Sequence, residues 1–477
     1  MKTEKTDYLV IGLGPAGMAC TLMAHSMGLN VTAIEKRKIG GECLNYGCIP
    51  SKALIKACKV KYWSEHANNF GLAPATLKPV SVFKRVRDVV YTVNQEKTSK
   101  LFEKVNVILG EHARFIDPYT VETDNHRITA KKIFLCLGTR PRLPSEVKGF
   151  SSIPYLTNET VFDIDDIPES IIVLGGGPIA CELGQCFRRL GSNVTLINKA
   201  SRLLPKAEEL ASSVLEKVFR EEGITVVNGA NVVQFERAQD KVKALLDDGR
   251  IFEGDTVLVA IGREFDYRDL KLENAGVNHD SSGIKVNDYL ETSQKHIYAV
   301  GDCNGYRLFT HAAMHQGMCA IMNSLIPGWM WFMKRKFKNY VVPWSVFTEP
   351  EVSSVGYTEA ELIRLGIKYD SEILYYADYG RALADACETG FVKIYFKRGV
   401  KPVILGATIV GENSSEMIQE WALAIQKKLT LYDIMFLQHS FPTFGFLSKR
   451  VPESWMMRTL QEKAFLKAFI KRWANFS

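Results

Sequence analysis

Short apolar runs that end in glycine recur along the chain, and each is followed by a pattern with helical spacing. In two places the succession is strand, helix, strand. These two copies cover 8–12, 15–27 and 31–34, and then 171–174, 178–190 and 194–197. A strand, a crossover helix and a second strand form a unit of a parallel sheet, so two copies predict two doubly wound α/β domains that each bind a nucleotide.

The pattern changes after about residue 340. Before this point, two more buried strands at 256–261 and 297–300 end at glycine, where ligand crevices form in parallel sheets. Beyond it come strands at 391–396 and 403–410 and an amphipathic helix at 415–428. We therefore expect a separate α+β domain at the C-terminal end.

Length and composition agree with this layout. The chain has 477 residues, of which 46% are hydrophobic and 24% charged, as in soluble globular proteins of about three domains. No run of 18 apolar residues and no signal-peptide pattern is present, so a cytoplasmic location is expected.

The net charge of +7 is concentrated in two places. Residues 334–338 carry +4 and residues 458–472 carry +4, which leaves the rest of the chain about neutral (7 − 8 = −1). This is local basicity in a chain of neutral balance, and no nucleic-acid partner is expected.

The turn of the first unit has the spacing of a dinucleotide-binding fingerprint. Gly12, Gly14 and Gly17 stand between strand and helix, where glycines allow a tight turn and the close approach of a pyrophosphate. Glu35 lies 21 residues after Gly14 (35 − 14) and is placed for a ribose hydroxyl. A plain turn is the alternative interpretation.

The second unit repeats the fingerprint with one difference. Its turn residues are Gly175, Gly177 and Ala180. The residue 21 positions after Gly177 (198 − 177) is Asn198, an amide in place of the carboxylate, and Lys199 and Arg202 follow. Without a carboxylate to repel a 2′-phosphate, NADPH becomes acceptable beside NADH. The two cations are equally consistent with a solvated surface.

Cys43 and Cys48 are the candidate reactive residues. A disulfide needs Cα atoms within about 7 Å, whereas five residues of regular helix rise about 7.5 Å. A bridged pair therefore requires an irregular loop, leading into a helix that starts near Pro50. Cys48 would then lie at a helix N-terminus, where the dipole favours the thiolate. Two unpaired thiols remain the alternative.

The other eight cysteines show no C-x-x-C spacing and suggest neither a zinc site nor a secreted disulfide framework, so no metal site is expected. They are expected to be buried small side chains: Cys20, Cys58, Cys136, Cys181, Cys186, Cys303, Cys319 and Cys387.

Residues 40–52 resemble the redox-active segment of the flavin-dependent disulfide reductases, the family of dihydrolipoamide dehydrogenase, glutathione reductase and mercuric reductase. The resemblance continues along nearly the whole chain. It is carried by Leu137-Gly138-Thr139, Gly262-Arg263, Gly301-Asp302 with 310–312, and the segments 343–351 and 406–416.

The resemblance implies a fold and a set of partners. It implies an FAD-binding domain in two parts (1–150 and 276–339), an NAD(P)-binding domain at 151–275, a dimerisation domain at 340–450, and a basic amphipathic C-terminal segment at 451–477. The cofactors implied are FAD and NAD(P)H, and the assembly implied is a homodimer.

The resemblance also implies residue roles. Cys48 would face the flavin and Cys43 would attack the substrate, with Lys52 and Glu182 as an ion pair beside the flavin ring. Asp302 would bind the ribityl chain of the flavin.

The match breaks near the end of the chain. Disulfide-reducing members have His-x-His-Pro-Thr-x-x-Glu, whose second histidine and glutamate form the acid/base pair supplied by the other subunit. This chain has His439, then Phe441 at the second histidine and Phe446 at the glutamate. Mercuric reductases share the Phe-Pro, but they add a C-terminal cysteine pair, and no cysteine follows Cys387 here.

Three functions remain open. The first is an NAD(P)H-dependent FAD oxidoreductase that uses the Cys43–Cys48 disulfide and an unidentified acceptor: a metal ion, a quinone or a disulfide. The second is dihydrolipoamide dehydrogenase, with His439 in place of the missing pair. The third is a catalytically quiet flavoprotein that acts as a sensor or scaffold, which intact Cys43, Cys48, Lys52 and Glu182 disfavour.

Two aromatic-basic clusters suggest a further partner. The first is 329–338; the second is the helical pattern of Leu460, Leu466, Phe469, Ile470, Trp473 and Phe476 with interleaved lysines. Such a helix either packs on its own domain or binds an anionic membrane or membrane protein. The second interpretation would place the protein at the inner face of a membrane.

Overall fold

The structure is a computed structural model that describes residues 1–462 and 464–474. It divides into two compact units. The first contains residues 1–62, 76–197 and 230–339, and the second contains residues 63–75, 198–229 and 340–477 apart from the residues not described. The sequence-predicted fold class is confirmed: two sheets built mainly of parallel strands precede a C-terminal α+β domain.

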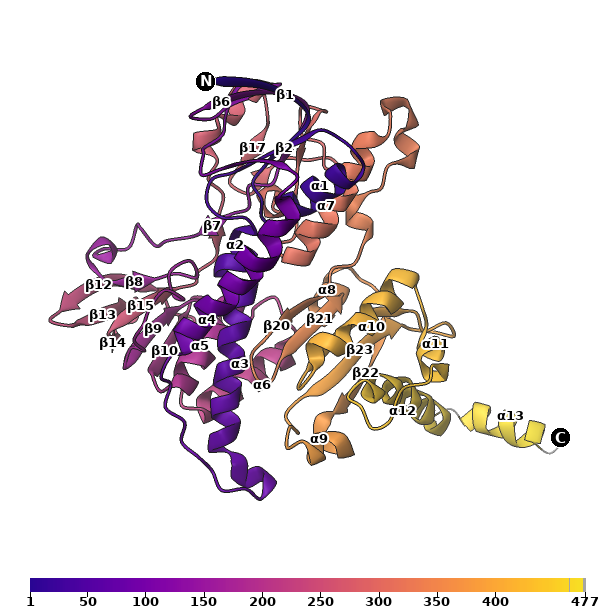
Figure 1. The fold of residues 1–477 in the computed structure, drawn as a ribbon. Coiled ribbons are helices and arrows are strands. Elements are labelled where there is room, and N and C mark those ends of the chain that lie inside the picture. The colour runs from indigo at the N-terminus through magenta and orange to yellow at the C-terminus, as the bar shows by residue number, and fades with distance from the viewer. Residues whose placement is uncertain (463, 475–477) are drawn as a thin grey trace. The chain divides into compact units, whose positions relative to one another are not determined.

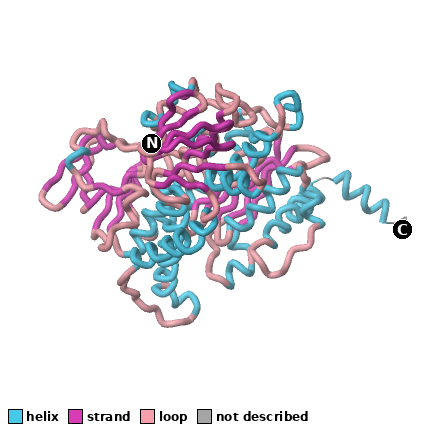
Figure 2. Tube along the Cα trace, turned by 45° about the horizontal axis from the view of Figure 1, so that its top comes forward, coloured by secondary structure: helices cyan, strands magenta, loops and turns pink. Residues whose placement is uncertain are grey.

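The first sheet runs in the order β3-β2-β1-β6-β5-β4, and β19 also pairs with β6. Its strands are β1 (Lys2–Ile11), β2 (Val31–Glu35), β3 (Asn106–Leu109), β4 (Arg114–Asp117), β5 (Thr120–Glu122), β6 (His126–Leu135) and β19 (Ile297–Ala299). All pairs are parallel except β4 with β5 and β5 with β6. Figure 2 shows these strands side by side next to the N-terminus.

Strand β1 begins at Lys2, although the apolar pattern predicted a start at Tyr8. The polar residues 2–6 pair in register with 126–130 of β6, so a long partner strand extends β1 beyond its hydrophobic part. A core of apolar side chains covers one face of this sheet and includes Leu9, Ile34 and Ile133, which share that face by their register.

Helix α1 (Pro15–Ser26) packs against β1, β2 and β6 of the first sheet. The other main helices that begin in this part of the chain are α2 (Gly41–Tyr46), α3 (Cys48–Glu65), α4 (Val82–Tyr91) and α7 (Thr310–Leu325) (Figure 1). α1 and α7 pack closely, because a Cβ added at Gly317 would lie 2.9 Å from the carbonyl oxygen of Ala16. Only a glycine at position 317 permits this approach.

The second parallel sheet has, within the first unit, the order β10-β9-β15-β8. Its strands are β8 (Tyr155–Leu156), β9 (Ser170–Leu174), β10 (Asn193–Asn198) and β15 (Thr256–Val259), and α5 (Pro178–Leu190) connects β9 to β10. An antiparallel sheet of β12 (Val232–Ala238), β13 (Lys241–Leu246) and β14 (Ile251–Gly254) follows.

The second unit is built on the antiparallel sheet β20-β21-β24-β23-β22. Its strands are β20 (Trp344–Val346), β21 (Val352–Gly356), β22 (Tyr369–Tyr375), β23 (Phe391–Lys397) and β24 (Ile404–Val410). Its helices are α6 (Glu209–Glu221), α8 (Glu359–Arg364), α9 (Gly380–Ala384), α10 (Ser414–Lys427), α11 (Leu431–Phe436), α12 (Phe446–Glu462) and α13 (Ala464–Ala474), and β11 (Thr225–Asn228) also belongs to it. α10 buries Ile418 and Trp421 in the core of this unit.

Candidate functional site

The two candidate redox cysteines lie on consecutive helices. Cys43 is in α2, and α3 begins at Cys48. Between them Gly47 has φ −130° and ψ −109°, which ends α2 and prevents one continuous helix. The predicted irregular loop is therefore a short helix followed by a break, and the second helix starts at Cys48 instead of near Pro50.

Cys43 and Cys48 are thiols in hydrogen-bonding contact in this structure. The pKa of Cys48 is lowered to about 6, first because Cys43 donates a hydrogen bond to it, and further because of Thr310 and the charge of Lys52. The pKa of Cys43 is raised by the same contact and by burial. The disulfide stays a prediction for the oxidised protein, and the contact shows that the two sulfurs are within reach of each other.

Thr310, the first residue of α7, lies next to the dithiol. Its Oγ1 is 3.3 Å from Cys48 Sγ, across 262 positions of sequence. The sequence placed Thr310 in a cofactor segment but gave it no role at the sulfur. A hydroxyl at this distance can donate to a thiolate, which favours the charged form of Cys48.

Lys52 and Glu182 lie together as expected. Lys52 Nζ is 2.9 Å from Glu182 Oε2, and the Glu182 side chain is 8% exposed. Lys52 is one turn along α3 from Cys48, and Glu182 is on α5, so the pair joins the dithiol helix to the second parallel sheet.

At two of its three glycines, the first turn is too tight for any other residue. A Cβ at Gly12 (φ +93°) would lie 2.5 Å from the carbonyl oxygen of Cys136, and one at Gly17 would lie 1.8 Å from the carbonyl oxygen of Gly12. Gly14, the N-cap of α1, has no side-chain cap, so the first N–H groups of the helix are open to an anion.

Three predicted cofactor segments meet at one edge of the first sheet. Gly12 follows β1, Gly138 and Thr139 follow β6, and Gly301 and Asp302 follow β19. These strands are parallel neighbours, so their carboxyl ends share an edge, which is where ligands bind in such sheets. Burial raises the pKa of Asp302 to about 6.

Glu35 holds the fingerprint turn. Its Oε2 accepts from Leu13 N at 2.7 Å and its Oε1 from Arg37 N at 2.8 Å. Each carboxylate oxygen retains a lone pair for a ribose hydroxyl. The glycine cradle, the uncapped helix and this carboxylate together fit the adenosine diphosphate half of FAD.

The second glycine turn repeats the first. A Cβ at Gly175 (φ +118°) would lie 2.3 Å from the carbonyl oxygen of Ala260, while Gly177 has open space beside it. Ala180 is fully buried. Gly262 (φ +120°) follows β15, the parallel neighbour of β9. The predicted residues of this turn therefore lie at one sheet edge, as in the first copy.

Asn198 has a structural role in its own loop. Its Nδ2 donates to the carbonyl oxygens of Ala200 (3.1 Å) and Arg202 (2.8 Å) and to Asn228 Oδ1 (3.0 Å). A carboxylate could make none of these bonds. The Arg202 guanidinium is bound to the carbonyls of Pro205 and Ala207, whereas Lys199 is exposed. Of the two predicted cations, Lys199 is the one whose ammonium extends into solvent.

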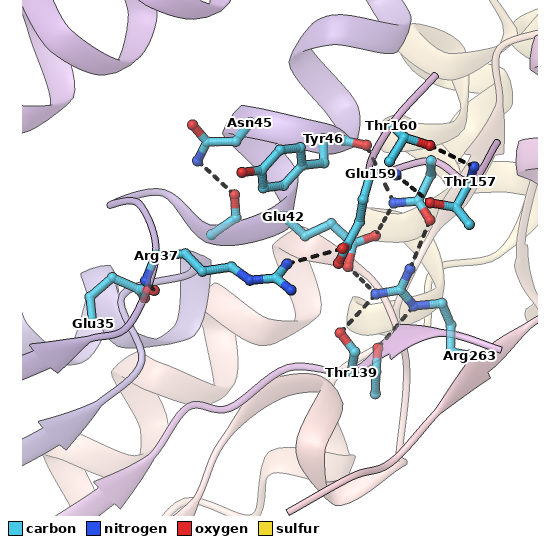
Figure 3. A network of polar contacts seen from close by, with 12 residues as sticks. Glu35, Arg37, Glu42, Asn45, Tyr46, Thr139, Thr157, Glu159, Thr160 and Arg263 are labelled. Carbon is cyan, nitrogen blue, oxygen red and sulfur yellow. Dashed lines mark hydrogen bonds and ion pairs between the residues drawn. The ribbon is translucent and has the colours of Figure 1, made fainter. Parts of the chain in front are cut away.

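Arg263 is the centre of a network that the sequence did not reveal (Figure 3). It forms an ion pair with Glu42 and donates to Thr139 Oγ1 (3.0 Å), the Thr139 carbonyl (2.9 Å) and Asn158 Oδ1 (3.2 Å). Asn158 in turn donates to Glu42 Oε1 at 2.8 Å. Burial raises the pKa of Glu42 to about 7, although Arg263 opposes this.

This network joins the dithiol helix α2 to the two segments that connect the first parallel sheet with the second. Next to it, β7 (Arg140–Pro141) pairs antiparallel with β16 (Arg263–Glu264), so the outgoing and returning chains run side by side. A sequence signal was present in Thr139 and Arg263, which both belong to cofactor segments, but nothing local indicated that they touch.

The expected acid/base positions are apolar in the structure as well. The rings of Phe441 and Phe446 are in contact, with centroids 5.2 Å apart, and Phe441 is 73% exposed. His439 Nε2 lies 2.9 Å from Glu420 Oε1 on α10. A histidine–glutamate pair is therefore present, but it is displaced from the position the motif predicts.

The basic clusters have more acidic partners in the fold than the sequence indicated. Lys334 is paired with Glu291, and Lys336 and Lys338 lie near Asp288, so the run at 334–338 does meet acids in space. Arg458 is paired with Glu372 at 2.6 Å. In α13, Ile470 and Trp473 are exposed, the side chains of Leu466 and Phe469 are not described, and Phe476 lies outside the described residues.

The described part of the chain contains neither a membrane-spanning helix nor a cluster of metal-ligand side chains. Within residues 1–462 and 464–474, no helix is both long and apolar enough to cross a membrane. In the same ranges, no three His, Cys, Asp or Glu side chains gather as a metal site. Seven of the eight other cysteines are buried, as expected, and Cys387 is half-buried.

Comparison with known proteins agrees with this geometry. Residues 6–317 match the pyridine nucleotide-disulphide oxidoreductase family and residues 342–449 match its dimerisation domain, which supports a homodimer. The chain is 31% identical to a mercuric reductase of Staphylococcus aureus (90% of this chain, 78% of the relative). It is 34% identical to a dihydrolipoyl dehydrogenase of Thermus scotoductus (93% and 96%).

Among solved structures, the fold is similar to that of the HOCl-induced flavoprotein disulfide reductase RclA from Escherichia coli. The TM-score is 0.84 at 24% identity, over 94% of this chain and 99% of that chain. Given the two matched domains and the full-length relatives, the chain belongs to the pyridine nucleotide-disulphide oxidoreductases, the enzymes that use FAD and NAD(P)H.

Proposed function

We propose that the protein passes electrons from NAD(P)H through FAD to the Cys43–Cys48 pair, and from there to an acceptor that needs no histidine–glutamate dyad at positions 441 and 446. The observation that carries this proposal is the contact between Cys43 and a Cys48 whose thiolate is favoured by Thr310 and Lys52. When the Cys43 thiol and the Cys48 thiolate close to a disulfide, they release two electrons and one proton.

The first sheet edge supplies the FAD site in this proposal. The residues are Gly12, Gly14, Gly17, Glu35, Gly138, Thr139, Gly301 and Asp302. The glycines let the backbone approach the diphosphate, Glu35 accepts from a ribose hydroxyl, and Asp302 binds the ribityl chain. FAD, when bound, links a hydride donor to a disulfide. Lys52 and Glu182 lie on the helices that border the dithiol.

The second glycine turn supplies the NAD(P)H site. Gly175, Gly177, Ala180 and Gly262 shape it, and Asn198 organises the loop that carries Lys199. We expect NADPH to be used at least as well as NADH. Lys199→Ala should raise the KM for NADPH and leave that for NADH unchanged; a wild-type enzyme strongly selective for NADH would contradict this expectation.

The class of electron acceptor is inferred from the missing acid/base residues. A positioned acid/base group contributes about 10²–10⁴ in rate, and phenylalanine at 441 and 446 provides none. A metal ion leads the three candidates, ahead of a quinone and a disulfide, because relatives 31–32% identical over 90% of this chain are mercuric reductases. Dihydrolipoamide dehydrogenase is the second function, supported by relatives at 32–34% identity and by the His439–Glu420 pair.

The domain layout predicted from the sequence completes the proposal: FAD domain at 1–150 and 276–339, NAD(P) domain at 151–275, interface at 340–450. We also propose a cytoplasmic enzyme. Contact of its C-terminal segment 451–477 with a membrane or membrane protein rests on the exposed Ile470 and Trp473 of α13.

One experiment tests the central step. NADPH is added without oxygen to the pure yellow protein, and the long-wavelength absorbance of a thiolate beside the flavin is recorded. A band that disappears in Cys48→Ser and persists in Cys43→Ser supports the assigned roles; the opposite pattern reverses them. No band in the wild type favours the catalytically quiet flavoprotein. An oxidant screen with the reduced enzyme then identifies the acceptor class.

A further inference from the structure

One face of the first unit exposes an unusual number of large apolar side chains. Four lie on α7 and four on the 3-10 segment η8 (Gly328–Met333). We call this the Met–Trp face: Met314, Met318, Met322, Leu325, Trp329, Trp331, Phe332 and Met333. The most exposed are Trp329 (77%), Phe332 (67%) and Trp331 (61%).

Helix geometry brings together the four residues on α7, and the four on η8 follow them directly along the chain. Met314, Met318, Met322 and Leu325 are spaced by four, four and three, so their side chains form a stripe along α7. The opposite side of α7 is buried through residues such as Ala313, Gly317 and Ala320 against α1. In Figure 1 the chain after α7 forms the salmon-to-orange loop that stands out from the end of this helix, and η8 lies in it.

The charge around the Met–Trp face is positive. From 307 to 340 the sequence contains five lysines and arginines and no acid. Arg335 is engaged in other contacts, so the charge of the face comes from the remaining four cations. Lys334 pairs with Glu291, and Lys336 and Lys338 both lie near Asp288. These three lysines and Arg307 against two acids give a net charge of +2 (4 − 2). The lysines at 336 and 338 are each 49% exposed.

We infer that the Met–Trp face docks on the interface of an anionic lipid bilayer. Tryptophan, with an apolar ring and a polar N–H, favours the headgroup level of membranes, and neighbouring cations attract anionic headgroups. Exposed apolar patches of this kind mark contact sites. A second copy of the chain is a poorer occupant, because two faces of charge +2 repel each other. This inference goes beyond the proposed reaction and does not depend on it.

The test is co-sedimentation of the full-length holoenzyme with vesicles of phosphatidylcholine, with and without phosphatidylglycerol. The wild type should bind the anionic vesicles at low salt, with a blue shift of tryptophan emission, and release at high salt. Trp329→Ser, Trp331→Ser and Phe332→Ser together should weaken partitioning at least about tenfold. NADPH-dependent reduction of the flavin should be unchanged in this triple variant.

Two further variants make the test specific. Leu109→Ser, Val233→Ser and Ile251→Ser remove three other exposed apolar side chains of the same unit, and this matched control should bind like the wild type. Lys336→Gln with Lys338→Gln lowers the charge of the face from +2 to 0 and should abolish the preference for anionic vesicles. If the triple variant fails to fold, Trp331→Ser alone, with the same emission measurement, replaces it.

Several results would overturn the inference. The first is that the wild type does not bind vesicles at low salt. The second is that the triple variant binds as well as the wild type, and the third is that the matched control loses as much binding as the triple variant. Loss of binding only on truncation after Glu462 would assign the contact to α13. A change in sedimentation coefficient of the triple variant without lipid would assign the face to a second copy.

Discussion

At the residue scale, the chemistry of the site depends on a few atoms around Cys48. The Cys43 thiol donates to it, Thr310 Oγ1 lies 3.3 Å away, and Lys52 adds a positive charge. All three stabilise the thiolate over the thiol. At neutral pH the thiolate is therefore the main form of Cys48, and a thiolate is the reactive form of cysteine.

The contribution of Cys43 can be measured by changing its donor capacity. Cys43→Ser keeps a hydroxyl donor, so Cys48 should remain a thiolate at pH 7 and become protonated as the pH falls through about 6. Cys43→Ala removes the donor, and the pKa of Cys48 should rise toward the ordinary value of about 8.5. The rate of Cys48 alkylation by iodoacetamide against pH, followed by peptide mass spectrometry, reports both. The same midpoint in the two variants would show that Cys43 does not set this pKa.

The missing dyad is a second residue-scale feature. Because the rings of Phe441 and Phe446 touch, a histidine and a glutamate in their places would lie within reach of each other. Phe441→His with Phe446→Glu should raise lipoamide turnover about tenfold or more, within the range of general acid/base catalysis.

Phe436→His, at another exposed phenylalanine of the same unit, is the matched control and should have no effect. Wild-type turnover that already equals that of authentic dihydrolipoamide dehydrogenases would show that another base acts. His439, paired with Glu420, would be the first to replace.

At the element scale, Arg263 holds α2 to β7 and β16, the strands in the two segments that connect the first parallel sheet with the second. The Arg263 side chain is only 13% exposed and has four polar atoms as partners. It therefore stabilises this junction more than a surface ion pair does. Arg263→Met leaves Glu42 without its cation and should lower the free energy of unfolding by about 2 kcal/mol. Urea denaturation followed by circular dichroism measures this loss.

Glu42→Gln should cost less, about 1 kcal/mol, because its amide oxygen can still accept one of the two bonds that Arg263 and Asn158 donate to different oxygens of Glu42. The folded pKa of Glu42 lies above its unfolded value of 4.5, so the folded state binds the proton more tightly. Its contribution to stability therefore declines as the pH rises from 4.5 toward 7, and Glu42→Gln should remove this part of the pH dependence. Equal destabilisation by both variants, with an unchanged pH profile, would contradict the assigned contacts.

At the scale of the whole molecule, the matched dimerisation domain supports a homodimer. With a subunit mass of 53.6 kDa, light scattering should give about 107 kDa (2 × 53.6). The triple variant of the Met–Trp face should have the same mass, because the dimerisation match begins at residue 342, beyond that face. A monomer at micromolar concentration would contradict this prediction.

The sequence by itself determined the features that depend on neighbouring residues. Glycine spacing fixed the two nucleotide turns, because only glycine tolerates the backbone at positions 12, 17 and 175. Periodicity predicted the bounds of α5 correctly and those of α1 to within one residue. The motif at 439–446 showed that the usual acid/base residues are absent, since this is a matter of residue type alone.

Only the tertiary structure decided contacts between distant segments. Thr310 with Cys48, Arg263 with Glu42, and Lys334 with Glu291 join residues 262, 221 and 43 positions apart. The local sequence pattern does not indicate such pairs, because they depend on which elements pack together in the fold. For the same reason, residues 334–338 form a basic run without neighbouring acids in the sequence. In the fold, the lysines of this run pair with Glu291 and Asp288.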